Sequence, residues 1–367
     1  MVQVVGPPSD GGIETIKEVI HVFDYIVVGA GSAGCVMAAR LAGAHRVLLI
    51  EAGRANPAWD FRLHMPAALS EVLTSKRYNW AFETEPEPFL GQRNLYCPRG
   101  KVVGGSSSIN GMIFVRGHAE DFNRWSEVYG ASGWSYQDVL PFFKRSETKA
   151  GGDPDFRGQT GPLKITNGDT SSPLCQAWLG AGESLGFGLT PDFNGETQEG
   201  FGPFDRTVAD GLRQSVARAY LSSENDLALS GLTVLTQAEV QHIEFDGDRA
   251  AGVQGLVDGR LKSFQASREI ILSAGAIKSP QVLMRSGIGS ESALKAAGIE
   301  CLAPSAEVGQ NLQDHLEVYV QAACPKPVSL YPSTRGLKKL AVGAQWLFTK
   351  RGDGATNHFH TGAFLRS

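Results

Sequence analysis

The sequence lacks the features that mark several classes of protein. No apolar run approaches the roughly 20 residues that a membrane-spanning helix needs. Basic residues are not in excess either, because 34 Lys and Arg face 38 Asp and Glu, for a formal net charge of −4. We therefore expect neither a transmembrane segment nor a nucleic-acid partner. Internal repeats and low-complexity tracts are also absent from the sequence.

Cysteine is scarce, with five among 367 residues. The number is odd, the residues are scattered, and no two have the C-x-x-C spacing. A disulfide framework or a zinc site is therefore not expected, and we predict free thiols and no metal. The five residues are Cys35, Cys97, Cys175, Cys301 and Cys324.

Residues 1–22 read as an N-terminal extension without a targeting signal. They carry Asp10, Glu14 and Glu18 against the single lysine Lys17. Transit peptides are rich in arginine and poor in acids, and no secretory signal is visible. The expectation from the residues alone is a cytoplasmic location.

Glycine, by contrast, is abundant, with 44 residues, and its placement near the start is informative. The apolar run of residues 25–28 leads into Gly29, Gly31 and Gly34, which have the spacing G-x-G-x-x-G. A helix-like segment and a second apolar run, Val47–Ile50, follow, and the run ends at Glu51. The order strand, turn, helix, strand, acid is that of the mononucleotide half of a dinucleotide-binding fold.

Each residue type in this unit has a physical role. Gly29 permits a sharp turn, Gly31 lets a pyrophosphate approach the backbone, and Gly34 lets the helix pack on the sheet. The first turn of the helix offers N–H groups and the positive end of its dipole to phosphates. Glu51 would accept hydrogen bonds from a ribose, and it argues against NADP. The motif alone leaves NAD and FAD open.

The length of the chain predicts about two domains. Turn signals over residues 146–173 read as a linker, whereas helices are expected near 120–125 and 176–185. Strands are expected at 232–236, 240–245 and 251–257. Residues 269–275 resemble a buried strand running into a glycine turn, and we expect it to return to the sheet that begins at Tyr25. The nucleotide domain is then discontinuous, and residues 146–225 are an insertion.

A second glycine-rich segment, residues 104–110, has the sequence GGSSSIN. Two glycines and three hydroxyls suit a backbone that lies flat against a ligand and donates hydrogen bonds. The alternative is a plain surface loop, but the segment leads directly into the apolar run 112–115. Residue chemistry favours the ligand-binding interpretation.

At this point the sequence resembles a known family, the glucose–methanol–choline (GMC) oxidoreductases. Residues 100–110 and 275–289 resemble its two signatures. Residues 115–122 and 309–315 are most similar to its choline-oxidising members, and the resemblance extends over nearly all of 24–367. It implies an α/β fold (α+β overall), with a FAD-binding Rossmann-like domain at 23–145 and 226–312. An incomplete substrate-binding domain is implied at 146–225 and 313–367.

The resemblance implies FAD as the cofactor and oxidation of an alcohol by hydride transfer to the flavin. Some members of the family attach FAD to a histidine, but Ile109 stands at that position here, so the FAD is expected to be non-covalent. The resemblance assigns cofactor contacts to Gly29, Gly31, Ser32, Ala33, Gly34, Glu51, Ala52, Arg99, Val103, Gly104, Ser107, Asn110, Gly111, Met112 and Val240.

The catalytic histidine implied by the resemblance is expected beyond Ser367, so no catalytic residue is assigned within the chain. His315 is a candidate for a substitute base, because Asp314 could orient its ring. A structural role in a loop is the favoured interpretation. His360 stands where choline-oxidising members carry a glutamate. A carboxylate there suits a quaternary ammonium, so His360 is placed on the substrate side and argues against choline itself.

The expected partners are a small alcohol and an electron acceptor that the sequence does not name; the oligomeric state stays open. The resemblance adds a mitochondrial location as an alternative. Two other functions remain open. One is a truncated, inactive FAD-binding protein with a binding or regulatory role. The other is NAD-linked hydride transfer, which explains residues 29–51 but not residues 104–110.

Overall fold

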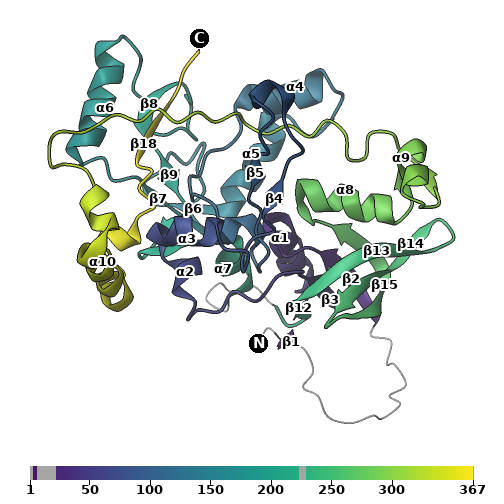
Figure 1. The fold of residues 1–367 in the computed structure, drawn as a ribbon. Coiled ribbons are helices and arrows are strands. Elements are labelled where there is room, and N and C mark those ends of the chain that lie inside the picture. The colour runs from purple at the N-terminus through teal and green to yellow at the C-terminus, as the bar shows by residue number, and fades with distance from the viewer. Residues whose placement is uncertain (1–2, 6–21, 223–228, 367) are drawn as a thin grey trace. The chain divides into compact units, whose positions relative to one another are not determined.

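The computed structural model describes residues 3–5, 22–222 and 229–366 (Figure 1). The chain forms two compact units, each built from several stretches of sequence. The first unit comprises Met1–Pro57, Leu73–Ile109 and Val216–Tyr319, and the second comprises Ala58–Val72, Asn110–Ser215 and Val320–Ser367. Residues 110–145, which the sequence placed with the nucleotide domain, thus cluster in the second unit.

The first unit is built on a mixed sheet whose seven described strands run in the order β1-β12-β3-β2-β15-β14-β13. Strands β1, β12, β3, β2 and β15 pair in parallel, and β15, β14 and β13 continue as an antiparallel meander. The strands are β1 (Gln3–Val5), β2 (Val22–Val28), β3 (Val47–Ile50), β12 (Leu232–Leu235), β13 (Ala238–Asp246), β14 (Arg249–Val257) and β15 (Arg260–Leu272). The α/β class with a parallel sheet is confirmed.

Strand β15 does return to the sheet that begins with β2. Glu269 pairs with Tyr25 and Leu272 pairs with Val28, in parallel register. The predicted strands at 232–236, 240–245 and 251–257 are present as β12, β13 and β14. Every residue of β3 is buried, as expected for a parallel strand covered on both faces.

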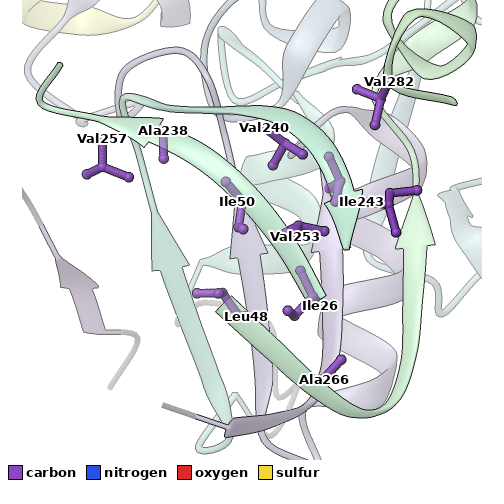
Figure 2. Close-up of a cluster of buried hydrophobic side chains, with 11 residues drawn as sticks. Ile26, Leu48, Ile50, Ala238, Val240, Ile243, Val253, Val257, Ala266 and Val282 are labelled. Carbon is purple, nitrogen blue, oxygen red and sulfur yellow. The ribbon is translucent and has the colours of Figure 1, made fainter. Parts of the chain in front are cut away.

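An apolar core lies where the parallel strands meet the β13–β14 hairpin (Figure 2). Ile26 and Leu48 come from the parallel strands, whereas Val240 and Val253 come from the hairpin, and all four are at most 8 % exposed. Ala238 and Val240 of β13 alternate with less buried residues, and a register irregularity between Val240 and His242 then brings Ile243 into the cluster. The core therefore fixes the register of the strands whose ends carry the site.

Helices of the first unit cover this sheet. Helix α1 (Ser32–Leu41) packs on β3 and α7 (Val216–Leu221), and α8 (Gly275–Arg285) packs on β13 (Figure 1). Cys35 is fully buried inside α1. The smaller elements of this unit are β4 (Phe82–Glu83), η2 (Pro88–Leu90), β5 (Tyr96–Cys97), η3 (Gly105–Ser108), β16 (Ile288–Gly289), α9 (Glu291–Ala296) and β17 (Ala303–Pro304).

The second unit contains short strands and several helices. Its strands are β6 (Glu147–Lys149), β7 (Leu163–Asn167), β8 (Gly200–Pro203), β9 (Asp205–Arg206), β10 (Val208–Ala209), β11 (Leu212–Arg213) and β18 (Thr361–Phe364). Its helices are α2 (Phe61–His64), η1 (Pro66–Ala68), α4 (Ala119–Glu127), α5 (Tyr136–Ser146), α6 (Pro173–Ser184), η4 (Tyr331–Thr334), α10 (Gly336–Thr349) and η5 (Asp353–Ala355). Helix α3 (Leu69–Leu73) spans a boundary between the units. The predicted helices near 120–125 and 176–185 correspond to α4 and α6.

The prediction of a linker over residues 146–173 is wrong. Strands β6 and β7 lie in this segment and pair in parallel. Glu147 is fully buried, and its Oε1 forms ion pairs with Arg116 Nη2 at 2.8 Å and Arg157 Nε at 2.7 Å. Arg157 also contacts Asp205 at 2.7 Å. Buried charges hold much of this segment, and its alternating buried apolar residues are limited to Leu163 and Ile165 of β7, so hydrophobic periodicity gave only a short signal.

Candidate functional site

Four parallel strands end at the same level along one edge of the sheet. Leu235 pairs with Ile50, Ile50 with Val28, and Val28 with Leu272. Backbone hydrogen bonds continue this alignment past the strands, from Gly29 N–H to the Ile50 carbonyl at 2.8 Å and from Ser273 N–H to the Val28 carbonyl at 2.9 Å. The turns that follow the strands therefore meet at the carboxyl edge, where open α/β sheets bind ligands.

A cavity of about 440 Å³ lies at this edge, and we call it the edge cavity. Its volume falls within the usual range for small-molecule and cofactor sites. It is lined by Val28, Gly29, Gly31, Ser32, Ala33, Ile50, Glu51, Ala52, Trp80, Phe82, Arg99, Gly100, Gly105, Ser106, Ala238, Glu239, Val240, residues 273–279 and Val282. All of these residues belong to the first unit.

The three glycines of the first turn differ in their surroundings. Gly29 has φ +96°, a conformation that side-chain-bearing residues rarely adopt. A Cβ on Gly34 would lie 1.8 Å from the Gly29 carbonyl oxygen, so only glycine lets α1 approach the turn this closely. A Cβ on Gly31 would meet nothing within 4 Å. Because Gly31 lines the edge cavity, that open space is available to a ligand.

Helix α1 begins at the cavity wall without a side-chain cap. Gly31 is its N-cap residue, no side chain caps the helix, and the first turn contains no acid. Ser32 and Ala33 of that first turn line the cavity. The first N–H groups and the positive end of the helix dipole are thus left for an anionic ligand such as a phosphate.

Glu51 lies buried at the end of β3, with 5 % of its surface exposed. Its Oε2 accepts a hydrogen bond from Ala30 N–H at 2.9 Å, and its Oε1 accepts one from Gly53 N–H at 2.8 Å. Burial raises the pKa of Glu51 to about 7, although the N–H groups of Gly53 and Ala30 act in the opposite direction. A carboxylate has about four acceptor positions, so ribose hydroxyls can still bind to it.

The second glycine segment packs directly on the first. Gly104 N–H donates to the Ala30 carbonyl at 2.7 Å, and a Cβ on Gly105 would lie 2.7 Å from Gly31 Cα. The Ser107 hydroxyl donates to the Gly104 carbonyl at 2.6 Å and accepts from Val216 N–H at 3.0 Å. Ser106 is the serine of this segment that lines the cavity. The backbone, more than the hydroxyls, therefore forms this wall.

Several cavity residues were not predicted as site residues from the sequence. Trp80 and Phe82 stack with ring centroids 5.7 Å apart and an interplanar angle of 7°. The ammonium groups of Lys101 and Lys278 lie 4.1 Å and 4.3 Å from the centre of the Trp80 ring. In the sequence, no spacing links Trp80 and Phe82 to the glycine segments. The start of α8 was visible in the second family signature, but it was not assigned to the site.

The predicted cofactor contacts fall into three groups. Eight line the edge cavity, namely Gly29, Gly31, Ser32, Ala33, Glu51, Ala52, Arg99 and Val240. Gly34, Val103, Gly104 and Ser107 belong to the same unit but do not line the cavity; they support the turns that do. Asn110, Gly111, Met112 and the substrate-side His360 belong to the second unit.

In the second unit, a buried arginine holds the turn at Asn110. Arg213 is 1 % exposed, and its Nη1 donates to the Asn110 carbonyl at 2.7 Å and to Asn110 Oδ1 at 3.0 Å. Asn110 Oδ1 also accepts from Met112 N–H at 3.1 Å, and Met112 has φ +61°. Burial lowers the pKa of Arg213 to about 9. Sequence reasoning missed Arg213, because one arginine in a mixed stretch gives no signal.

His360 lies in a polar group of the second unit. Its Nδ1 accepts from Asp169 N–H at 3.1 Å, and its Nε2 lies 3.5 Å from Thr356 Oγ1. Burial and the nearby Arg206 lower the pKa of His360, although Asp169 acts in the opposite direction, and the lowered pKa favours the neutral ring at pH 7.

His315, the alternative base, is exposed. Asp314 Oδ1 accepts from the His315 backbone N–H at 2.9 Å, and its Oδ2 pairs with Arg99 at 3.2 Å. Both oxygens therefore have partners other than the imidazole ring. The described part of the chain contains no group of three metal-ligand side chains, and none of its helices is long and apolar enough to cross a membrane.

The edge cavity fits a dinucleotide. An uncapped helix N-terminus faces it, Gly31 leaves room for a pyrophosphate, and a buried carboxylate stands at the ribose position. The stacked rings of Trp80 and Phe82 add an apolar wall beside these polar groups. The chemistry of the donors and the open space agree with the same ligand class.

Comparison with known proteins places these observations in a family. The family model described as GMC oxidoreductase matches residues 23–317 of this chain. Oxygen-dependent choline dehydrogenase from Brucella anthropi is 49 % identical over 94 % of this chain, and mitochondrial choline dehydrogenase from Mus musculus is 46 % identical over 98 %. The chain spans 62 % and 61 % of the lengths of these two relatives.

Among solved structures, a variant of formate oxidase from Aspergillus oryzae, studied for the effect of a mutation on FAD modification, is similar to this chain. The TM-score is 0.84 at 27 % identity, and the match covers 94 % of this chain and 62 % of that one. Pyridoxine 4-oxidase from Mesorbium loti has a TM-score of 0.73 at 34 % identity, covering 77 % of this chain and 55 % of that one.

Proposed function

The chain belongs to the GMC oxidoreductase family, and we propose that it provides the FAD-binding part of an enzyme that oxidises an alcohol. The edge cavity carries this proposal, because it combines a glycine turn, an uncapped helix N-terminus and a buried carboxylate. When bound, FAD supplies the acceptor for the hydride that leaves the alcohol carbon. NAD-linked transfer would leave the wall of the cavity at Gly105 and Ser106 without a role.

The residues of this chain bind and orient the cofactor. The N–H groups at the start of α1 bind the pyrophosphate, and Glu51 accepts from ribose hydroxyls. The backbone at Val240 would contact the adenine, and the Gly104–Ser107 segment would hold the flavin half. Ile109 is 1 % exposed and carries a hydrocarbon side chain, which supports non-covalent binding at that position.

The second unit contributes the substrate side in this proposal. Arg213 fixes the turn of Asn110, Gly111 and Met112, and the Gly111 carbonyl accepts from Asn357 Nδ2 at 2.8 Å. His360 stands where choline-oxidising members of the family carry a glutamate, and both Arg206 and Asp169 lie near its ring. We therefore favour a small alcohol other than choline as the substrate.

The base that takes the hydroxyl proton is not assigned to this chain. No histidine lines the edge cavity in the described part of the chain. The electron acceptor is left unassigned. For location, the mitochondrial relative from Mus musculus supports the mitochondrion, and the cytoplasm is the alternative expected from the residues alone.

The proposal is tested by cofactor binding to Gly31→Val. At φ −76° and ψ −166° the backbone accepts a β-branched residue, and a Cβ at this position contacts no protein atom within 4 Å. The side chain would instead occupy space in the edge cavity. We expect the Kd for FAD, measured by flavin fluorescence, to rise by at least about 30-fold, a loss of roughly 2 kcal/mol.

Gly188→Val is the matched control, because a Cβ at Gly188 also meets nothing within 4 Å and Gly188 does not line the cavity. Its Kd for FAD should stay near that of the unmodified chain, and both variants should keep its thermal stability. Equal FAD affinity in Gly31→Val and Gly188→Val, or tighter binding of NAD than of FAD, would count against the proposal. Alcohol oxidation is tested separately, by anaerobic bleaching of the bound flavin with a panel of alcohols.

A further inference from the structure

A second cavity of about 500 Å³ lies in the first unit and is lined mainly by polar residues. We call it the basic pocket. It is formed by the turn after β3, the segment before Tyr78, Lys101, the start of β13 and the β14–β15 turn. Its lining residues are Ala52, Gly53, Arg54, Lys76, Arg77, Lys101, Gln237, Glu239, Leu256, Asp258 and Gly259.

The basic pocket concentrates positive charge in a chain whose net charge is −4. Four cations line it, Arg54, Lys76, Arg77 and Lys101. Within the described residues, none of the four has a carboxylate at ion-pair distance. The two acids of the lining do not neutralise them, because Glu239 pairs with Lys278 at 2.8 Å and Asp258 is a single exposed carboxylate. Four like charges around one hollow repel one another unless an anion is present.

The walls of the basic pocket are held in place by the backbone. Gln237 N–H donates to the Gly53 carbonyl at 2.8 Å, and Lys101 N–H donates to the Tyr78 carbonyl at 2.7 Å. The Arg54 carbonyl accepts from Val103 N–H at 2.9 Å. The Lys101 ammonium rests 4.1 Å from the centre of the Trp80 ring. A ligand would therefore meet cations on a largely preformed frame, which lowers the entropic cost of binding.

The lining also indicates the kind of anion. The basic pocket shares Ala52 and Glu239 with the edge cavity, but no aromatic side chain lines it. Bases of nucleic acids commonly stack on such rings. The cavity is nevertheless much larger than a single small ion needs. A hydrophilic ligand with several negative oxygens suits this combination, and arginine and lysine are the usual partners of phosphate groups.

We propose that the basic pocket binds a small polyphosphate or phosphorylated metabolite beside the cofactor site, through Arg54, Lys76, Arg77 and Lys101. Its position at the shared wall of Ala52 and Glu239 makes it a neighbour of the edge cavity, distinct from it in charge and lining. The site does not depend on which cofactor or alcohol the protein uses. The proposal can therefore stand or fall separately from the proposed function.

The test is calorimetric titration of the purified chain, with and without added FAD, at constant ionic strength. Sodium tripolyphosphate and glucose 6-phosphate are the two phosphate probes, and citrate is the carboxylate polyanion for comparison. We expect saturable binding at one site for at least one phosphate probe. The phosphate probe that binds more tightly shows which class of ligand the pocket prefers, a polyphosphate or a phosphate monoester. Absence of saturable binding by both, or equal binding of citrate, would overturn the proposal.

Two variants test the location. Lys76→Gln with Arg77→Gln removes two exposed cations of the pocket and should raise the Kd by at least about tenfold. The control is Lys144→Gln with Arg145→Gln, which removes the same charge at the end of α5 in the second unit and should leave the Kd within about twofold. Equal weakening in the two double variants would show a general charge effect and refute the site.

Asp258→Asn gives an independent measurement. Asp258 has φ +51°, which asparagine tolerates well, so the fold should be retained. Removing this carboxylate from the lining should tighten phosphate binding by about twofold or more. Unchanged or weaker binding in this variant would contradict the proposed position of the ligand, whatever the result for the lysine–arginine pair.

Discussion

The Glu51 side chain joins two turns at the edge of the sheet, because one oxygen accepts from Ala30 N–H and the other from Gly53 N–H. These N–H groups belong to the turns after β2 and β3. Cys35 lies beneath the first turn, with its Sγ 3.2 Å from the Ala30 carbonyl. Burial raises the pKa of the Cys35 thiol, so it stays neutral and leaves Glu51 as the group that titrates. At the residue scale, one carboxylate thus holds the turns after β2 and β3 together and also lines the edge cavity.

Glu51 makes the stability of the cofactor-free protein depend on pH. Its pKa is raised from 4.5 to about 7 in the folded state, mainly by burial. The folded state therefore keeps a proton that the unfolded state has lost between these values. Stability is greatest below the unfolded pKa and is lost as pH rises to about 7. Urea unfolding should show a loss of up to about 3 kcal/mol between pH 4.5 and pH 8 from this group.

Glu51→Gln should flatten this part of the pH profile, because the amide cannot ionise. Glu300→Gln, at an exposed position, is the matched change and should keep the slope of the unmodified protein. If Glu51→Gln and the unmodified protein lost stability in parallel over this range, the assignment to Glu51 would be wrong.

At the scale of the element, strands β6 and β9 depend on buried charge. The Glu147 carboxylate of β6 forms ion pairs with Arg116 and Arg157. Arg157 also forms an ion pair with Asp205 of β9. Lys149 of β6 also contacts Asp205. These ionic groups are nearly fully buried. Removing one member leaves its partners charged and unsolvated, which costs far more than losing a surface pair.

Glu147→Gln should lower the free energy of unfolding by about 3–5 kcal/mol, because it leaves two arginines facing a neutral side chain. The matched control is Glu71→Gln, which breaks the exposed pair with Lys339 in the same unit and should cost less than about 1 kcal/mol. Urea unfolding at pH 7 measures both. Costs of similar size would mean that the Glu147 cluster is no more important than a surface pair.

The same elements show how far the sequence could predict this molecule. Elements with a local signal were found, such as β2 with its glycine turn, β3 ending at Glu51, and β15 returning to the sheet. The linker prediction failed because Glu147 and Arg157 look like surface residues until their partners are known. Trp80 and Arg213 were missed for a related reason. Each acts through residues distant in sequence, and no spacing rule links them to the site.

At the scale of the whole molecule, non-covalent packing holds the chain together. All five cysteines lie in described residues and are free thiols. They are distributed over both units, from the fully buried Cys35 to the exposed Cys324. Neither unit depends on a redox state, so a reducing agent should leave stability unchanged.

A thiol titration tests this arrangement. A colorimetric disulfide reagent should modify five thiols per chain in denaturant, whereas in the native protein Cys324 should react first and Cys35 last. Thermal unfolding should give the same Tm with and without dithiothreitol. Fewer than five reactive thiols in denaturant without reductant would reveal a disulfide and contradict the structure.

The pairing of β15 with β2 has a consequence for how the protein is made. The Ser273 hydroxyl bonds the Val28 carbonyl across 245 positions of sequence. A ribosome adds about 5–20 residues per second. After β2 emerges from the ribosome, its edge stays unpaired for roughly 12–50 seconds until β15 has been synthesised. During that interval the turn after β2 lacks its neighbour on one side, and the exposed edge of β2 can pair with other chains, which favours aggregation of the incomplete protein.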